Sequence, residues 1–483
     1  MSKEKNRPIE QDIHEKTCTS LAEDLRAGNL TSVAITEHFL ARIHERNPRL
    51  NAFRLVCEKR ALAQAKAADD LFEAGVDLGP LHGIPYAAKD LYDVAGLPTT
   101  AGSPLLEDNI AKRDCAVVAS LNRAGMVLLG KTNTVQFAYG GVGINHHHGT
   151  PHNPWHALPH VPGGSSSGSG VAVAAGMAPM ALGSDTGGSV RIPAAVCGIT
   201  GLKTTVGRVS RAGVQPLSHS LDTVGPLVRR TMDAALVLDA IQGPDADDPT
   251  TSGRTFGSVS KEIDRKAKDL VLGVPRRVFF DDCDSEVERC VRDAIATFES
   301  CGARVVDIDF DEATQAMELN PRGLIIAAEA YSVYADLLES EGAKVDPVVA
   351  GRIERGRDIP AHEYIKTVRS WEALRRRALD RLADIDALLC PTVMIPPPSV
   401  EEAMRSLDDY TRFNLQMLRN TTIGNILDLC GLSVPCGYTE KGFPVGLMIY
   451  GRPFDEAGIL RIGRTFERMT RWHERRPDLA WIG

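Results

Sequence analysis

The chain of 483 residues carries a formal net charge of −8, and its composition is 43% hydrophobic and 24% charged. This balance is typical of a globular protein with a large apolar core. The negative charge argues against nucleic acid or an anionic membrane surface as the main partner. The nearly uncharged run 171–183 contains Pro179 and is too short to span a bilayer.

Predicted elements begin after residues 1–16, which we expect to form a flexible N-terminal tail. Ser20 with Glu23 forms a capping-box pattern for a short helix, and Thr31 is placed to cap the next one. Further helices are expected at about 58–74, 114–124, 168–176, 189–195, 285–299, 313–340, 361–383, 408–428 and 455–470. Strands are expected at about 83–90, 126–132, 179–183, 270–275, 304–310, 387–391, 433–437 and 443–451.

This alternation of strands and helices predicts an α/β protein with a mixed sheet covered by helices on both faces. The segment 240–360 is more charged and poorer in glycine than the centre of the chain, so it is a candidate cap or subdomain. The chain shows no internal repeat.

Ten cysteines are spread along the chain, and none form a Cys-x-x-Cys pair. Several lie in apolar runs, as Cys390 and Cys430 do. Buried, reduced thiols are typical of a reducing compartment rather than of a disulfide framework. The first residues are polar and include no apolar secretory segment. We therefore expect a cytoplasmic protein.

Two Gly/Ser clusters, joined by an uncharged Ala/Val/Met run, dominate the segment 163–191. The first contains Ser165, Ser166 and Ser167, and the second is the run 185–189, Asp-Thr-Gly-Gly-Ser. Glycines around a serine let the backbone approach a ligand and aim several N–H groups at one point. An enzyme that attacks a carbonyl needs such donors beside a nucleophilic oxygen.

The first cluster has two other interpretations. It could be a flexible linker, but an apolar helical stretch follows at once. Residues 164–168 also match the G-x-S-x-G turn of α/β-hydrolases, which requires a preceding strand. The preceding residues 156–162 contain two prolines and make a poor strand.

The second cluster predicts an anion-binding turn. The N–H groups of Thr186, Gly187, Gly188 and Ser189 can converge on an oxyanion, and a following helix N-terminus adds positive potential. Such a turn can also bind phosphate, but the chain has no G-x-x-x-x-G-K-[ST] pattern.

Lys89 follows an apolar strand and precedes Asp90. It is either a surface lysine at a strand end or a buried lysine held neutral. Burial lowers the pKa of a lysine from its ordinary value of about 10.4. A neutral lysine can act as a general base.

Histidines recur every four residues from His148 to His160, a spacing that would place them on one face of a helix. The intervening Pro151, Pro154 and Pro159 would break that helix, and no carboxylate cluster completes a zinc site. The sequence therefore indicates no metal site, and it contains no cofactor motif.

The order of Lys89, GGSSSGS (163–169) and SDTGGSVRIP (184–193) closely resembles the amidase signature family. Flanking matches include LHGIPYAAKD (81–90), TNTVQFAYG (132–140) and FPVGLMIYGRPFDE (443–456). The resemblance implies a single amidase domain, here over 17–483 with its signature core at about 70–230. It implies one large mixed β-sheet as the framework.

The family's catalytic unit is a Ser-cisSer-Lys triad. By resemblance, the nucleophile is Ser189, the lysine is Lys89, and the bridging serine, preceded by a cis peptide bond, is Ser166. The resemblance places the oxyanion donors on the backbone of Thr186, Gly187, Gly188 and Ser189. It places substrate contacts near Tyr139, Gly140 and Gly141.

The implied reaction is hydrolysis of a carboxamide, and a pocket with apolar residues such as Phe137, Val142 and Ile144 favours a small aliphatic or aryl amide. The alternatives are the glutaminase subunit of a tRNA-dependent amidotransferase, a ureido-type amide hydrolase, and an inactive amide-binding protein. Expected partners are a small-molecule amide and a second copy of the chain, without nucleic acid or membrane.

Overall fold

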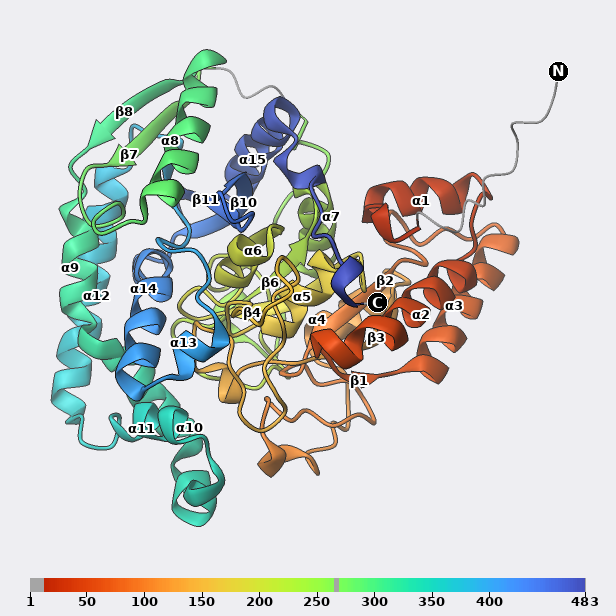
Figure 1. Ribbon diagram of the computed structural model, residues 1–483, viewed down its shortest axis with the longest axis horizontal. Helices are drawn as coiled ribbons and strands as arrows, with labels where there is room; N and C mark the ends of the chain where they lie inside the picture. Colours follow the sequence, from red (N-terminus) through yellow and green to blue (C-terminus); the bar gives the residue numbers. More distant parts are fainter. Residues whose placement is uncertain (1–12, 265–268, 483) are drawn as a thin grey trace.

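One 11-stranded sheet forms the centre of the computed structural model, which describes residues 13–264 and 269–482. The strand order is β1-β3-β2-β4-β6-β5-β10-β11-β9-β7-β8. Figure 1 shows the two outermost strands of this order, β1 and β8, far apart in the molecule. The strands are β1 (Phe53–Val56), β2 (Pro85–Lys89), β3 (Val127–Thr132), β4 (Met180–Asp185), β5 (Thr200–Lys203), β6 (Thr223–Val228), β7 (Val271–Pro275), β8 (Arg304–Ile308), β9 (Ala387–Pro391), β10 (Cys430–Tyr438) and β11 (Pro444–Gly451).

The sheet is mixed. Strand β2 runs parallel to β3 and β4, and β7 runs parallel to β8 and β9, whereas the other neighbouring pairs are antiparallel. Central strands such as β2 and β4 are buried along their whole length. Such strands carry apolar or small residues on both faces because both faces are covered.

Helices cover both faces of this sheet. Neighbouring strand residues Leu432 and Ser433 point to opposite faces. Leu432 lies against Gly463 of α15, whereas Ser433 and Gly446 lie toward Ala195 of α6. The helices are α1 (Cys18–Arg26), α2 (Ser32–Leu50), α3 (Glu58–Glu73), α4 (Ala116–Arg123), α5 (Ser167–Ala174), α6 (Arg191–Cys197), α7 (Thr231–Ile241), α8 (Ser285–Ser300), α9 (Asp311–Leu319), α10 (Leu324–Glu341), α11 (Pro347–Glu354), α12 (Ala361–Arg381), α13 (Val400–Met404), α14 (Leu407–Ile426) and α15 (Glu456–Thr470). The predicted α/β fold with a large mixed sheet is confirmed.

Local differences from the prediction have local causes. The helix expected over 313–340 is two helices, α9 and α10, because Pro321 and Gly323 interrupt it and Gly323 has a φ of 74°. Helix α1 is capped by Thr17 with Ser20 rather than by Ser20 with Glu23. Of the expected tail, residues 1–12 lie outside the described residues, and Ile13 is packed in the core.

The topology brings two chain segments to one edge of the sheet. Strands β2 and β4 are parallel neighbours, so Lys89 and Asp185 both end their strands at the same edge. The loop after β4 leads into α6, and the 163–166 segment leads into α5 next to it. Ligands of α/β proteins commonly bind at such carboxyl ends of parallel strands.

Candidate active site

Lys89 lies at the buried end of β2 with none of its surface exposed. Its Nζ atom lies 2.8 Å from Ser165 Oγ and 2.8 Å from Ser184 Oγ. Burial lowers the pKa of Lys89 to about 7, although the charges of Asp222 and Asp185 oppose this shift. At pH 7 an amine with this pKa is neutral in about half of the molecules, and the neutral form can accept a proton. The alternative of a surface lysine is therefore wrong.

The serine that contacts Lys89 is Ser165, and the cis peptide bond joins Gly164 to Ser165. The prediction of Ser166 for this position is wrong by one residue. The Ser166 hydroxyl instead contacts the backbone of Ser184, with 3.3 Å to both its N and its O atom. Ser166 occupies the N-cap position of α5, so its side chain is directed to β4 rather than to the lysine.

Ser189 lies in the turn between β4 and α6 and is 5% exposed. Its Oγ has no hydrogen-bond partner within the described part of the chain. Its carbonyl accepts a hydrogen bond of 3.2 Å from the backbone N–H of Ser166. The segment that carries the lysine-bound serine therefore lies directly beside the segment of Ser189.

Three of the expected oxyanion donors have no hydrogen-bond acceptor within the described residues. The N–H groups of Thr186, Gly187 and Ser189 donate to no other residue among those described. The N–H of Gly188 instead donates to Asp185 Oδ1 at 2.8 Å. This contact excludes Gly188 from the donor set, so the expectation for Gly188 is corrected.

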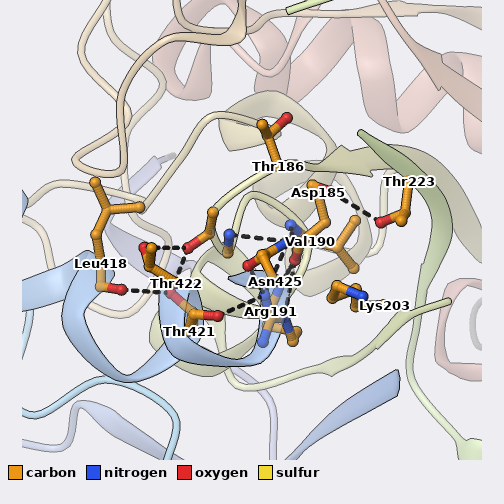
Figure 2. Close-up of polar contacts among 12 residues, drawn as sticks. Asp185, Thr186, Val190, Arg191, Lys203, Thr223, Leu418, Thr421, Thr422 and Asn425 are labelled. Atoms are coloured by element: carbon orange, nitrogen blue, oxygen red, sulfur yellow. Dashed lines mark hydrogen bonds and ion pairs between the residues drawn. The ribbon is translucent and has the colours of Figure 1, made fainter. Parts of the chain in front are cut away.

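An ion pair beneath the turn fixes its backbone. Asp185 and Arg191 are fully buried, and Arg191 Nη2 lies 2.9 Å from Asp185 Oδ1. Asp185 also accepts a hydrogen bond from the N–H of Val190 at 3.1 Å (Figure 2). Burial disfavours ionisation of Asp185, but the Arg191 charge and hydrogen bonds outweigh it and hold the pKa of that carboxyl well below its usual range. At neutral pH the turn is thus built on an ionised carboxylate.

The loop at Tyr139, Gly140 and Gly141 lies next to the cis peptide. The carbonyl of Gly141 accepts a 2.7 Å hydrogen bond from the N–H of Gly164. The guanidinium of Arg352, in α11, donates to Tyr139 O at 2.8 Å and lies over the rings of Tyr139 and Tyr410. Within the described residues Arg352 has no carboxylate partner.

A cavity of about 280 Å³ opens beside this turn. Ser184, Thr186 and Asp222 form part of its wall, together with Leu217 and Ser218. Asp222 Oδ1 accepts a 2.5 Å hydrogen bond from Thr186 Oγ1, which ties the cavity wall to the turn. Phe137, Val142 and Ile144, which we expected in a pocket, are buried and are not among the residues that line this cavity.

The histidine segment has structural contacts. His152 Nε2 lies 2.9 Å from the carbonyl of His156, in a loop rather than a helix. Among the described residues, no group of three or more His, Cys, Asp or Glu side chains could hold a metal ion.

A membrane-spanning helix is not found within the part of the chain that the structure describes, because none of its helices combines the necessary length and hydrophobicity.

Ser184 and Arg191 are functional candidates that sequence reasoning missed. The parallel pairing of β2 and β4 places Ser184 near the lysine, and this pairing is not visible in a single sequence. Asp185 and Arg191 are six residues apart, and their pairing depends on the turn between them.

A lysine of lowered pKa that contacts a serine, beside a turn with open N–H groups, is the equipment of an acyl-transfer hydrolase. The comparisons with known proteins agree with this class. The family described as Amidase matches residues 34–460. The chain belongs to this family, whose members hydrolyse amide C–N bonds, and it is therefore an amidase-family hydrolase.

Similar proteins include several activities. A glutamyl-tRNA(Gln) amidotransferase subunit of Chromohalobacter salexigens is 38% identical over 96% of this chain and 99% of its own length. The 2-amino-5-chloromuconic acid deaminase of Comamonas testosteroni is 37% identical over 93% of this chain and 96% of its own. The solved 6-aminohexanoate cyclic dimer hydrolase superposes with a TM-score of 0.87 at 27% identity, covering 96% of this chain and 99% of that one.

Proposed function

We propose that this protein is a serine amidase that converts a carboxamide to a carboxylate and ammonia or an amine, with Ser189 as the nucleophile. The observation that carries the proposal is the buried amine of Lys89, with a pKa of about 7 and 2.8 Å from Ser165 Oγ. The backbone hydrogen bond from the N–H of Ser166 to the carbonyl of Ser189 supports the proposal, because it holds the chain segment of Ser189 beside that of Ser165.

In the first half-reaction, Lys89 Nζ takes the proton of Ser165 Oγ, which takes the proton of Ser189 Oγ. Ser189 Oγ forms a bond to the amide carbon, and the carbonyl oxygen becomes an oxyanion held by the N–H groups of Thr186, Gly187 and Ser189. The C–N bond then breaks. Ser165 donates a proton to the leaving nitrogen and regains one from Lys89.

In the second half-reaction, water attacks the acyl group on Ser189 and loses a proton through the same two residues. The ester bond to Ser189 Oγ breaks, and the carboxylate leaves. Every proton that leaves Ser189 or water thus returns to the leaving nitrogen, to Ser189 Oγ or to solvent. The relay needs only the side chains of Lys89, Ser165 and Ser189.

The test is release of ammonia from butyramide, benzamide, succinamate and a ureido amide by the purified chain. Ser189→Ala is expected to abolish release from any amide that the native protein hydrolyses. The loss should be accompanied by an unchanged melting temperature, because the side chain of Ser189 makes no hydrogen bond within the described residues. Retained turnover in Ser189→Ala would refute the proposal.

We take a small aliphatic or aryl amide as the substrate class. A second candidate is glutamine, with the chain acting as the glutaminase subunit of an amidotransferase and binding partner subunits. Two observations favour it: amidotransferase subunits match over 99% of their length, and the cation of Arg352, beside the loop at Tyr139, has no carboxylate partner among the described residues. Glutamine hydrolysis by the isolated chain, or co-purification with other subunits, separates the two candidates.

The ten cysteines form no disulfide, and all except Cys283 and Cys301 are buried. Unpaired thiols of this number fit a reducing compartment, so we place the reaction in the cytoplasm. We further propose a homodimer as the state of the free enzyme, which analytical ultracentrifugation measures directly.

A further inference from the structure

A helix more than 200 residues away in sequence contacts the turn that holds Ser189. Thr421 and Thr422, both in α14 and labelled in Figure 2, donate hydrogen bonds from their hydroxyls to the carbonyl of Gly187. Thr421 Oγ1 lies 2.6 Å from Gly187 O, and Thr422 Oγ1 lies 3.2 Å from it. The same backbone oxygen thus has two hydroxyl partners.

We propose that Thr421, supported by Thr422, is a positioning residue for the oxyanion donors of this enzyme. The inference rests on the proposed function and adds a residue to it. It concerns the peptide unit between Gly187 and Gly188, which lies in the middle of the donor turn.

Both polar ends of that peptide unit are bound. Its N–H, on Gly188, donates to Asp185 Oδ1 at 2.8 Å, and its carbonyl, on Gly187, accepts from Thr421. In a planar trans peptide these two groups point in opposite directions, so binding both prevents rotation of the unit. The orientation of this unit sets the directions of the neighbouring N–H groups of Gly187 and Ser189.

The turn needs such an external restraint because two successive glycines have wide conformational freedom. Gly188 has a φ of 137°, which side-chain-bearing residues rarely adopt. A Cβ atom on Gly188 would lie 2.2 Å from Thr421 Oγ1. Gly188 and Thr421 are therefore packed directly against each other, and no space is left between them for the turn to move.

Thr421 is itself held on its other side. Arg191 donates from Nη2 to Thr421 O at 3.1 Å and to Asn425 Oδ1 at 2.6 Å, while Asn425 Nδ2 donates to Asp185 Oδ1 at 2.9 Å. Figure 2 shows Asp185, Arg191, Asn425 and Thr421 gathered around these contacts. Helix α14 is thus hydrogen-bonded both to the buried ion pair and to the carbonyl of Gly187.

A purely local role for the Thr421 hydroxyl is the competing interpretation. Threonines in helices often donate to a preceding carbonyl, and Thr421 Oγ1 also lies 3.0 Å from Leu418 O. The contact to Gly187 O is shorter by 0.4 Å, the difference between 3.0 and 2.6 Å. Since a hydroxyl has one proton, the shorter contact to the turn takes it.

The experiment measures the reaction of Ser189 with a fluorescent alkyl fluorophosphonate. In this reaction Ser189 Oγ bonds to phosphorus, fluoride leaves, and the proton passes to the Lys89 relay, while the phosphoryl oxygen occupies the oxyanion position. The maximal rate and the half-saturating concentration are measured separately for the native protein, Thr421→Ala, Thr421→Ser and Thr422→Ala. Peptide mapping locates the adduct.

Thr421→Ala is expected to lower the maximal rate by about 10- to 100-fold, because misplaced donors lose transition-state stabilisation. The half-saturating concentration should stay within about twofold, because the donors act on charge that develops in the transition state. Thr421→Ser keeps the hydroxyl and should restore most of the rate. Thr422→Ala, which loses the longer contact, should reduce the rate by less than Thr421→Ala and remains informative if Thr421→Ala fails to fold.

Ser406→Ala is the matched control on the same helix. Ser406 caps α14 at its far end by accepting the N–H of Asp409, so its loss destabilises the helix without touching the turn. This variant should lower the melting temperature and leave the labelling rate unchanged. A general loss of α14 stability is thereby separated from the loss of the Thr421 contact.

Equal labelling rates in Thr421→Ala and the native protein, or a Thr421→Ser variant as slow as Thr421→Ala, would overturn this inference and leave the proposed function intact. A native protein that is not labelled at Ser189 would overturn the proposed function and this inference together.

Discussion

Lys89 Nζ and Ser165 Oγ lie 2.8 Å apart, and both residues are fully buried. A buried amine is not hydrated, so its charged form is disfavoured. A neighbouring hydroxyl then becomes its main hydrogen-bond partner. The Ser184 hydroxyl, also 2.8 Å away, holds the amine from the other side. This pair of contacts distinguishes Lys89 from Lys131, whose amine lies 2.9 Å from the carboxylate of Asp90.

The first prediction separates two adjacent serines. Ser165→Ala should lower kcat by about 10²- to 10⁴-fold, the range of a lost proton-transfer group. Ser166→Ala is the matched control, because among the described residues the hydroxyl of Ser166 hydrogen-bonds only to the backbone of Ser184. It should chiefly lower the melting temperature. A larger loss of kcat in Ser166→Ala than in Ser165→Ala would restore the assignment expected from sequence.

The second prediction concerns pH. The relay requires neutral Lys89, and burial lowers its pKa to about 7. As pH falls below that value the amine is protonated, so kcat/KM should fall about tenfold per pH unit. It should reach a plateau above about pH 8. The pH profile of kcat/KM between 5 and 9 measures this limb.

Lys89→Arg supplies the control for the pH profile. An arginine stays protonated throughout this range, so the variant should be inactive at every pH. An acid limb in the native protein that lies two or more pH units away from 7 would contradict the assignment of the base.

The third prediction concerns the ion pair beneath the turn. Arg191→Met removes the partner of Asp185 and leaves a buried carboxylate unpaired, which should lower the free energy of unfolding by about 3–5 kcal/mol. Urea denaturation at pH 7 measures the change. Arg292→Met, which breaks an exposed pair with Glu288, should have little effect. Equal effects of the two substitutions would show that the buried pair does not support the turn.

The stability from Asp185 should also depend on pH. Its pKa is lowered in the folded protein, so the stabilisation is present above the ordinary carboxyl pKa of about 4. It should disappear as the pH falls below that value toward the lower pKa of the folded state. Arg191→Met should lack this part of the acid dependence.

The fourth prediction tests whether Arg352 reads a substrate carboxylate. Arg352→Gln should raise KM for glutamine and succinamate by about 10- to 100-fold, the worth of a hydrogen bond to a charged group. KM for butyramide, which has no carboxylate, should not change. Arg355→Gln, on an exposed arginine one turn along, is the control. Equal KM changes for all three amides in Arg352→Gln would rule out carboxylate recognition.

Much of the fold could be predicted because its elements carry local signals. The apolar run before Lys89 is strand β2, and Thr31 caps α2 through a hydrogen bond to the N–H of Ala34 as expected. The weaker elements β1, β5 and β6 were not predicted. Strands β1 and β5 have only four residues each, and for all three strands the pairing with distant strands decides the conformation.

The site could be predicted only in part for a related reason. Three consecutive serines cannot be told apart by residue type. The choice between Ser165 and Ser166 depends on where α5 begins and on the position of the cis bond. The hydrogen bond from the Gly188 N–H to Asp185 depends on the exact conformation of one turn, which the sequence does not specify. The contacts of Thr421 with that turn join segments that no local pattern connects.

The most direct test of the central claim is the pH dependence of fluorophosphonate labelling at Ser189, read by peptide mapping in the native protein and in Lys89→Met. In the native protein we predict a single adduct on Ser189, formed at a rate that rises with pH through about 7, the pKa of Lys89. In Lys89→Met we predict that this adduct does not form. An adduct on another serine, or a Ser189 labelling rate that is the same with and without the Lys89 amine, would contradict the account.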